Sequence, residues 1–409
     1  MKFIDNLEKE EYENFVKSYA KTHFLQSYYW GQASKTRGLI PHYVGIKEND
    51  KLVATALLLE KKLLFGYTHF YIPRGYIIDY NNIELLTLFT NEIKKYTKKR
   101  KSLYFKIDPD IKLHNIDKDA KVIDDNENNY ELVENLKKIG FKHEKLNLYF
   151  ENMQPRFTFR VPISDDTETI RKRYSKSVLR WIKQADKYGV EVKIGDKEDL
   201  KEFIRLMKMT EKRQGFYSHD ANFYEPLYDL FSEENHIHLY MASIDLEHVY
   251  KTLNEEIETC EDEEKKKKLT SRLEFYKGLK YKDNKINVSS YVNICYGDKS
   301  WYLYGANDMN FKDTFANYKL FDFQIQKSKE FGMKIFDEFG TIGDPNSTRS
   351  VAGLHEFKKK FGGEYTEFIG EFTYVTKPFM NFIFRILVPI YRKIGKFFRI
   401  LKGKFYKSN

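Results

Sequence analysis

The stretch from Met333 to Glu371 constrains the fold of this 409-residue chain more than any other. A β-rich segment from Ile335 to Gly340 leads into a polar loop, and a helical segment then ends at the glycine pair Gly362-Gly363. An amphipathic helix over Phe315 to Phe331, closed by Gly332, precedes this stretch. The order helix, strand, loop, helix, strand predicts an α/β module.

A similar arrangement occurs in the first third of the chain. A predicted helix over Asn82 to Lys99 precedes a strand over Leu103 to Ile107, which ends at Asp108. The later helix likewise precedes a strand that carries Asp337. Because 409 residues are too many for one ordinary core, we predict an α/β (α+β) chain of two domains with related patterns.

The clearest insertion lies between two predicted β segments, His236 to Ile244 and Ile286 to Gly297. Apolar residues three and four positions apart form two helical runs, one ending at Cys260 and the next beginning near Leu269. This heptad-like pattern over 244–284 predicts an antiparallel coiled-coil hairpin. Its arms would be about 20 to 25 Å long at about 1.5 Å per residue.

Basic residues set the choice of partners. Lys and Arg (70) outnumber Asp and Glu (60) by 10, which favours a polyanionic partner. Residues 379–409 contain no acid and place apolar residues on one helical stripe, which predicts a basic amphipathic tail lying on an anionic membrane surface. The tail cations expected to contact the membrane are Arg392, Lys393, Lys396 and Arg399.

Cysteine usage and the N-terminal segment indicate the compartment. Cys260 and Cys295 form no CxxC pair and no spacing suited to zinc, so no metal site is predicted. The first residues carry acids where a signal peptide has an apolar core, and no segment has the roughly 20 apolar residues of a spanning helix. We expect a cytoplasmic protein held peripherally at the inner face of the cell membrane.

Short motifs along nearly the whole chain resemble the FemABX family, aminoacyl-tRNA-dependent transferases that build the branched side chain of peptidoglycan. The C-terminal matches are Lys334-Ile335-Phe336-Asp337, Phe339-Gly340, Ser350, Gly353-Leu354, Phe357-Lys358, Phe361-Gly362-Gly363 and Ile369-Gly370-Glu371-Phe372. The resemblance implies two tandem GNAT-like (acyl-CoA N-acyltransferase-like) domains. Residues 1–155, completed by 369–378, would form the first domain, and 156–368, with the inserted hairpin, the second.

The resemblance also implies roles for individual residues. Lys358 is expected to stabilise the oxyanion with Glu371 nearby, and Asp108 to bind or deprotonate the attacking amine, unless a tRNA phosphate takes that proton. The expected substrate contacts are Lys35, Tyr104, Arg213, Tyr217 and Tyr304. A basic helix over Glu168 to Tyr188 is expected to follow the tRNA backbone through Arg173, Lys176, Arg180 and Lys183, or else to be a solvated surface.

The implied reaction transfers Ala, Ser or Gly from aminoacyl-tRNA to the amine of the stem-peptide side chain of a lipid-linked peptidoglycan precursor. An aminoacyl ester is already activated, so aminoacyl-tRNA is the co-substrate and no other cofactor is expected. The hairpin is expected to bind tRNA or to contact a second copy of the chain or a related family member.

Two alternatives stay open. An acetyl-CoA-dependent N-acetyltransferase would need a Q/R-x-x-G-x-G/A turn between strand and helix, which the sequence lacks. A non-enzymatic RNA-binding or membrane-binding protein would use the basic helix and the tail, but it leaves the series of site residues without a role.

Overall fold

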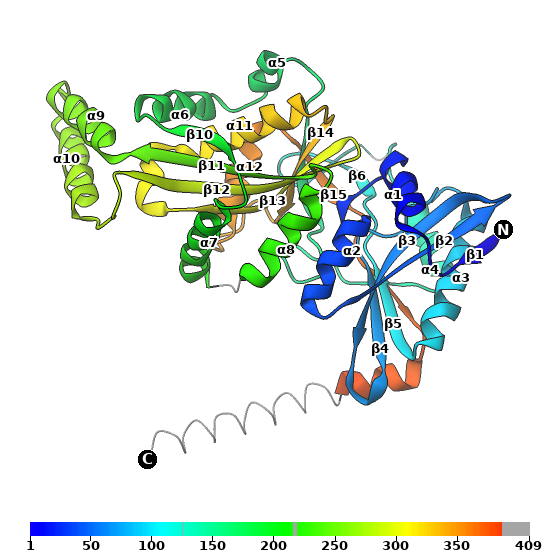
Figure 1. Ribbon diagram of the computed structural model, residues 1–409. Helices are drawn as coiled ribbons and strands as arrows, with labels where there is room; N and C mark the ends of the chain where they lie inside the picture. The colour runs from blue at the N-terminus through cyan, green and yellow to red at the C-terminus, as the bar shows by residue number, and fades with distance from the viewer. Residues whose placement is uncertain (125, 216–218, 387–409) are drawn as a thin grey trace.

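The computed structural model describes residues 1–124, 126–215 and 219–386 (Figure 1). Tyr217 and the four tail cations, Arg392, Lys393, Lys396 and Arg399, lie outside these residues. Two mixed β-sheets with helices packed against them form the described part of the chain. No helix within these ranges is both long enough and apolar enough to cross a membrane.

The first sheet has seven strands in the order β1-β2-β3-β4-β5-β16-β8. Their bounds are β1 (Lys2–Ile4), β2 (Ile40–Glu48), β3 (Lys51–Lys62), β4 (Thr68–Ile72), β5 (Ser102–Ile107), β16 (Phe372–Val375) and β8 (Lys142–His143). Strands β1 to β4 pair antiparallel, and helix α3 (Ile83–Lys99) then crosses over to β5, which pairs parallel to β4. The Asn82 side chain begins α3 by accepting a hydrogen bond from the Leu85 N–H.

The second sheet has nine strands in the order β10-β11-β12-β13-β14-β9-β15-β6-β7. Its first five strands are consecutive in the chain, as are the first five of the first sheet. The strand bounds are β10 (Glu191–Gly195), β11 (Ile237–Asp245), β12 (Lys285–Tyr296), β13 (Lys299–Asn307), β14 (Ile335–Thr341), β9 (Phe157–Pro162), β15 (Glu364–Phe368), β6 (Lys112–Ile116) and β7 (Val122–Asp124). Helix α11 (Ala316–Glu330) links β13 to its parallel neighbour β14. The predicted repeat of helix and strand is confirmed, and the architecture is two tandem GNAT-like units.

The order of strands along the chain does not follow the two sheets, because the late strand β16 completes the first sheet and the early strands β6 and β7 extend the second. Strand β16 lies antiparallel between β5 and β8, and β9 lies between β14 and β15. Strands β6 and β7, from the range predicted for the first domain, pair in the second sheet through β15. The exchange binds the two halves together by backbone hydrogen bonds.

A hydrophobic core shared by both halves fixes their relative position. The Trp301 ring on β13 lies 4.7 Å from the His23 ring and 5.1 Å from the Phe24 ring, centroid to centroid. Helix α2 (Tyr28–Ser34) of the first half packs on helix α8 (Ala221–Ser232) of the second. Side chains from the two halves can therefore form one preorganised site.

The inserted hairpin consists of α9 (Leu246–Glu258) and α10 (Glu263–Gly278), which project from the far end of the second sheet (Figure 1). Val249 and Leu253 of α9 are buried with Leu273 of α10. The predicted antiparallel helical hairpin is thus confirmed, with arms close to the predicted length.

The predicted single basic helix over Glu168 to Tyr188 is wrong in one respect, because it is two helices, α5 (Thr167–Lys172) and α6 (Lys176–Lys187). At the break the Ser175 N–H donates to the Lys360 carbonyl (2.8 Å), a tertiary partner in place of a helical one. The adjacent Tyr174 ring packs edge-on against Phe361. Helical periodicity cannot reveal such a contact with a distant segment.

Candidate active site

Asp108 directly follows β5 and is buried at the end of the first sheet, with 5% of its surface exposed. Its Oδ2 accepts a hydrogen bond from the Tyr71 hydroxyl (2.7 Å), and its Oδ1 accepts one from the Arg74 backbone N–H (2.6 Å). Arg74 and Gly75 both have positive φ, so a tight turn after β4 carries this N–H.

Burial raises the pKa of Asp108 to about 7, although the charge of Arg74 and the hydrogen bond from Tyr71 both lower it. A carboxyl with this pKa exchanges its proton near neutrality, which suits a group that accepts a proton from an ammonium.

Asp337, the acid of the second half that matches Asp108, has a different environment. Its Oδ2 accepts from Arg160 Nε (2.8 Å), and its Oδ1 accepts from the Thr158 hydroxyl (2.5 Å). Arg160 Nη2 also donates to Asp110 (2.5 Å), so one guanidinium bridges both halves. The structure therefore distinguishes an acid held in an ion network, Asp337, from an acid able to exchange a proton, Asp108.

Glu371 lies close to Asp108. One of its carboxylate oxygens pairs with the Lys106 ammonium, and the other accepts from the Met153 N–H (3.2 Å). The Glu371 charge adds to the effect of burial in raising the pKa of Asp108. The two carboxylates expected at the site are thus brought together, whereas the carboxylates that act on Lys358 are Glu338 and Asp337.

Tyr104 and Lys106 are two residues apart on β5, so their side chains lie on the same side of the sheet. Its ring stacks on His69 at 5.2 Å, and both rings line a groove of about 390 Å³. Lys106 also lines this groove, so its ion pair with Glu371 connects the groove to the buried carboxylates.

Lys358 ends helix α12 (Ala352–Lys358) and is buried. The parallel pairing of β13 with β14 ends at Trp301 and Asp337. Just beyond it, the Lys358 ammonium donates to β14 carbonyls, those of Glu338, Phe339 (3.3 Å) and Gly340 (2.7 Å). The lysine therefore lies where the two strands separate.

Burial lowers the pKa of Lys358 to about 8, against the opposing charges of Glu338 and Asp337. The Lys358 ammonium lies 5.3 Å from the centre of the Tyr302 ring. At neutral pH the group is mostly a cation in a site of low dielectric, the environment in which one positive charge stabilises an oxyanion strongly.

The remaining expected substrate contacts are spread over the junction of the halves. Tyr304 on β13 packs on the Tyr224 ring at 5.4 Å, and burial raises its pKa to about 12. Lys35 is exposed in the short turn after α2, and Arg213 is exposed in the last turn of helix α7 (Leu200–Gln214).

Sequence reasoning missed Arg37, two residues after Lys35. Its guanidinium carbon lies 5.0 Å from the Trp30 ring and 5.5 Å from the Phe223 ring, so one cation contacts both halves of the protein. Its charge also acts on Tyr304 and partly offsets the effect of burial on the pKa of that hydroxyl. Its closeness to Lys35 was the only signal in the sequence.

The expected tRNA contacts divide into two groups. Lys176, Arg180 and Lys183 are exposed and follow one face of α6. Arg173 precedes α6 and is half-buried, where it donates to the Pro162 carbonyl (2.9 Å) and pairs with Asp165 (3.0 Å).

The hairpin packs directly against this basic helix. Glu256 of α9 accepts hydrogen bonds from Gln184 (2.9 Å) and Lys187 (2.6 Å) of α6. The hairpin therefore lies next to α6 in the second half (Figure 1).

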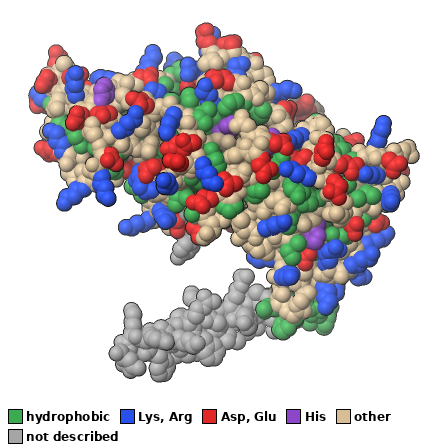
Figure 2. All heavy atoms as spheres, in the orientation of Figure 1, with side chains coloured by type: hydrophobic (Ala, Val, Ile, Leu, Met, Phe, Trp, Pro, Cys, Tyr) green, Lys and Arg blue, Asp and Glu red, His purple; other side chains and the backbone are tan. Residues whose placement is uncertain are grey.

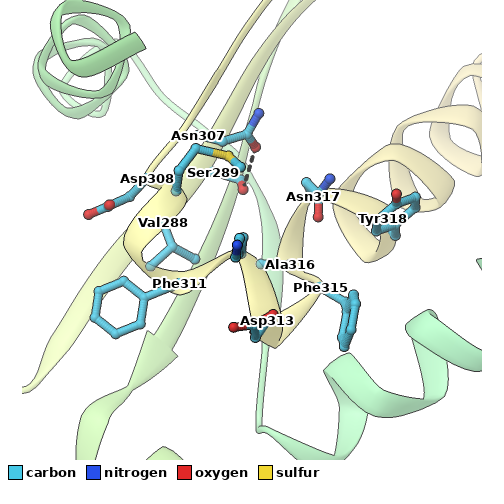
Figure 3. A pocket seen from close by; sticks show the side chains of 12 residues that line it. Val288, Ser289, Asn307, Asp308, Phe311, Asp313, Phe315, Ala316, Asn317 and Tyr318 are labelled. Carbon is cyan, nitrogen blue, oxygen red and sulfur yellow. Dashed lines mark hydrogen bonds between the residues drawn. The ribbon is translucent and has the colours of Figure 1, made fainter. Parts of the chain in front are cut away.

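The connection between β13 and α11 argues against an acetyl-CoA site. It forms a pocket of about 350 Å³ lined by Asp308, Asp313 and aromatic rings, with Ser289 bonded to Asn307 at its edge (Figure 3). Residues 308–315 contain no glycine, and Asp308 already accepts from the Asn310 N–H (3.0 Å). N-acetyltransferases bind pyrophosphate at a glycine-rich turn in this connection, and the second half has no such turn here.

The Tyr71→Phe variant tests how the Asp108 pKa is set. Loss of the hydroxyl removes a hydrogen bond that favours the carboxylate, so the pKa of Asp108 should rise by about one unit, given about 1.4 kcal/mol per unit. In a pH–rate profile of the reaction in which Asp108 is expected to accept a proton, the acid limb should move to higher pH. Tyr76→Phe, a buried tyrosine that does not bond Asp108, should leave that limb in place.

A model of the FemAB family matches residues 7–272 and 259–387. The chain belongs to the FemAB family. It is 30% identical over 428 residues to a lipid II:glycine glycyltransferase of Staphylococcus epidermidis, covering 98% of this chain and 99% of that protein. A protein of the same name from Staphylococcus aureus is 29% identical, with the same coverage.

Solved structures agree with the family assignment. A crystal structure of FemX has a TM-score of 0.77 at 27% identity, covering 94% of this chain and 99% of that one. A conserved protein of Bacteroides thetaiotaomicron, at 9% identity and a TM-score of 0.51, shares the fold alone. The expected family and fold are confirmed, while the roles of individual FemAB site residues stay predictions.

Proposed function

We propose that this FemAB member transfers an amino acid from aminoacyl-tRNA to the amine of the stem-peptide side chain of a lipid-linked peptidoglycan precursor, which builds the interpeptide branch. Two observations support the proposal: burial raises the pKa of Asp108 in the first half to about 7, and Lys358 is a buried cation in the second half. Full-length relatives whose names specify lipid II and glycine support the same substrates.

In the proposed reaction, Asp108 takes one proton from the acceptor ammonium and leaves a nucleophilic amine. The amine attacks the ester carbonyl, and a C–N bond forms while the carbonyl oxygen gains negative charge beside Lys358. The C–O bond to the tRNA ribose then breaks, and the second amine proton passes to the leaving ribose oxygen. Because the ester is already activated, the chemistry needs neither a nucleotide nor a metal.

The acceptor is proposed to lie along the face of the first sheet that carries Tyr104, Lys106 and Asp108. Lys35, Arg213 and Tyr217 are proposed to hold its phosphates and sugar, with Tyr304 and Arg37 at the junction. Held in this way, the amine meets the ester in one orientation, and positioning supplies a large share of the rate.

The tRNA is proposed to contact the exposed cations of α6 and the adjoining hairpin. Replacing Lys176, Arg180 and Lys183 together by Ala should weaken tRNA binding roughly tenfold or more. It should also reduce the salt dependence, by about 0.7 to 0.9 in the log–log slope for each phosphate that is no longer neutralised. The matched control replaces Lys137, Lys138 and Lys142, exposed cations of the first half, and should change neither quantity.

The hairpin has a second proposed use, contact with another copy of the chain or with a related family member. Deleting 246–278 and measuring both tRNA affinity and sedimentation separates the two uses. If neither quantity changes, both proposals for the hairpin are wrong.

The direct test of function is transfer of radiolabelled Gly, Ala or Ser from charged tRNA to lipid-linked precursor, with and without vesicles. Transfer of one amino acid is expected, with vesicles raising the rate because the enzyme is proposed to work at the inner membrane surface. No transfer from any charged tRNA, together with acetyl-CoA turnover or simple RNA binding, would overturn the proposal.

A further inference from the structure

Exposed apolar side chains gather at one end of the first half, where β3 turns into β4. The turn η3 (Leu64–Gly66) exposes 81% of Phe65 and 43% of Leu64. The helix that begins at 378 exposes 73% of Phe379, 63% of Phe382 and 47% of Ile386. We call these five residues the apolar face; it is the green area at the lower end of the molecule in Figure 2.

The turn and the helix form one surface, because the buried Phe384 ring lies between them. Its centroid is 6.4 Å from that of Phe65 and 5.3 Å from that of Tyr67. Phe379, Phe382 and Ile386 are spaced three and four apart, so they share one side of the helix. The apolar face is therefore contiguous rather than a set of scattered residues.

The fold gives no reason for a phenylalanine at the tip of this turn. Phe65 has φ of 58°, a left-handed conformation that Gly or Asn adopts at lower cost, and its ring is almost fully in water. An exposed aromatic side chain held in a strained turn indicates that an apolar partner covers it.

Cations surround the apolar face. Lys61 and Lys62 end β3 beside the turn, and Arg385 is exposed on the helix. The Lys377 ammonium lies 5.4 Å from the Tyr67 ring, at the start of the same helix. Apolar side chains ringed by Lys and Arg match an anionic bilayer, in which lipid phosphates meet the cations and acyl chains meet the rings.

We propose that the apolar face docks this protein on an anionic lipid bilayer, with Leu64 and Phe65 entering the boundary between headgroups and acyl chains beside the helix at 378–386. The inference deepens the proposed function, because it rests on a lipid-linked acceptor. It assigns a membrane role to a turn more than 300 residues before the basic tail.

Docking in this orientation places the groove in which the acceptor is proposed to lie at the membrane surface. Phe384 and Arg385 line the groove of about 390 Å³ together with His69, Tyr104 and Lys106. Lys106 joins the groove to Glu371, and Glu371 acts on Asp108. A lipid-linked acceptor can then present its peptide to Asp108 while its lipid stays in the bilayer.

The test places an environment-sensitive NBD fluorophore on the full-length protein at position 65. A Cys260→Ser background removes the more exposed of the two native cysteines, and Phe65→Cys supplies the labelling site. With phosphatidylglycerol vesicles we expect NBD emission to increase severalfold and shift to the blue. Phe275→Cys, at a phenylalanine 50% exposed on α10 at the opposite end, should show no change.

A second measurement compares vesicle affinity by co-sedimentation. Burial of Leu64 and Phe65 in the bilayer should raise the affinity for vesicles at least tenfold. The double change Leu64→Ser and Phe65→Ser should therefore weaken binding to phosphatidylglycerol vesicles tenfold or more. Phe275→Ser should bind as the parent does. Because Leu64 and Phe65 are exposed, the double variant should keep the melting temperature of the parent.

The outcomes separate this inference from the proposed function. Unchanged emission at position 65 while the protein co-sediments would overturn the inference, because another segment would then bind the membrane. A changed sedimentation coefficient of the double variant with unchanged vesicle affinity would also overturn it, by identifying a protein partner. Transfer to a water-soluble acceptor tests the proposed function alone and should be equal in the double variant and the parent.

Discussion

Replacing Lys358 by Met is expected to lower kcat about 10² to 10³-fold, the usual loss when one stabiliser of an oxyanion is removed. The expected size follows from burial, since a cation in a buried site of low dielectric acts much more strongly than one in solution. KM should change little, because the charge on the ester oxygen develops only in the transition state. Single-turnover transfer from charged tRNA measures the chemical step directly.

The matched control is Lys360→Met, two residues further on, where the side chain is 27% exposed and its ammonium lies 3.8 Å from Glu356. It should transfer at the parental rate. Lys358 also donates to carbonyls of β14, so its removal should lower the free energy of unfolding by about 1 to 3 kcal/mol. Denaturant unfolding will show whether the variant is folded; a folded Lys358→Met protein with unchanged kcat contradicts the proposed role.

Local patterns in the sequence predicted much of the fold. The helix over Asn82 to Lys99 is found as α3 with the Asn82 cap, and the hairpin followed from apolar residues three and four apart. These features depend on neighbours in the chain, which the sequence displays directly. The pattern of helix, strand and acid also predicted the repeat, although it could not distinguish the environments of Asp108 and Asp337.

Features that depend on distant segments were not predictable in the same way. The pairing of β16 with β5 and of β15 with β6 joins segments more than 200 residues apart. The break between α5 and α6 depends on a bond from Ser175 to Lys360. Arg37 owes its position to Trp30 and Phe223, which come from different halves of the chain. Periodicity contains no information on such contacts.

The candidate site likewise combines residues that the sequence could predict with contacts that it could not. Motifs of the family pointed to Asp108, Glu371 and Lys358, but they could not predict which groups hold them. The partners Tyr71 and Lys106 lie on β4 and β5, and they meet these carboxylates only in the folded sheet. These partners decide the charge state of each acid, so the chemistry depends on contacts that only the structure supplies.

The pH dependence of transfer is expected to be bell-shaped, with its limbs set by Asp108 and Lys358. Transfer should rise through about pH 7 as Asp108 loses its proton, and fall through about pH 8 as Lys358 loses its charge. Asp108→Asn should abolish the acid limb and lower kcat about 10² to 10⁴-fold. Single-turnover rates from pH 5.5 to 9 on parent and variant measure both effects; an acid limb that persists in Asp108→Asn would transfer the base role to another group, such as a tRNA phosphate.

Stability should respond to the same substitution with a defined sign. The folded pKa of Asp108 is raised above its unfolded value, so the carboxyl contributes its full stability below the unfolded pKa, and that contribution is lost as pH rises through about 7. Asn cannot ionise, so Asp108→Asn should gain stability relative to the parent between pH 5 and pH 8. Asp110→Asn should lower the melting temperature by a similar amount at pH 5 and at pH 8. The Arg160 charge and other cations outweigh burial and hold the pKa of Asp110 below its usual value, so the carboxylate is ionised and stabilises the fold at both pH values. Melting temperatures of both variants and the parent at pH 5 and pH 8 test the assignment. If the melting temperature of Asp108→Asn relative to the parent is higher at pH 8 than at pH 5, Asp108 is a carboxyl kept at a cost to stability, as a catalytic base is. If it is lower at pH 8, Asp108 is a structural acid.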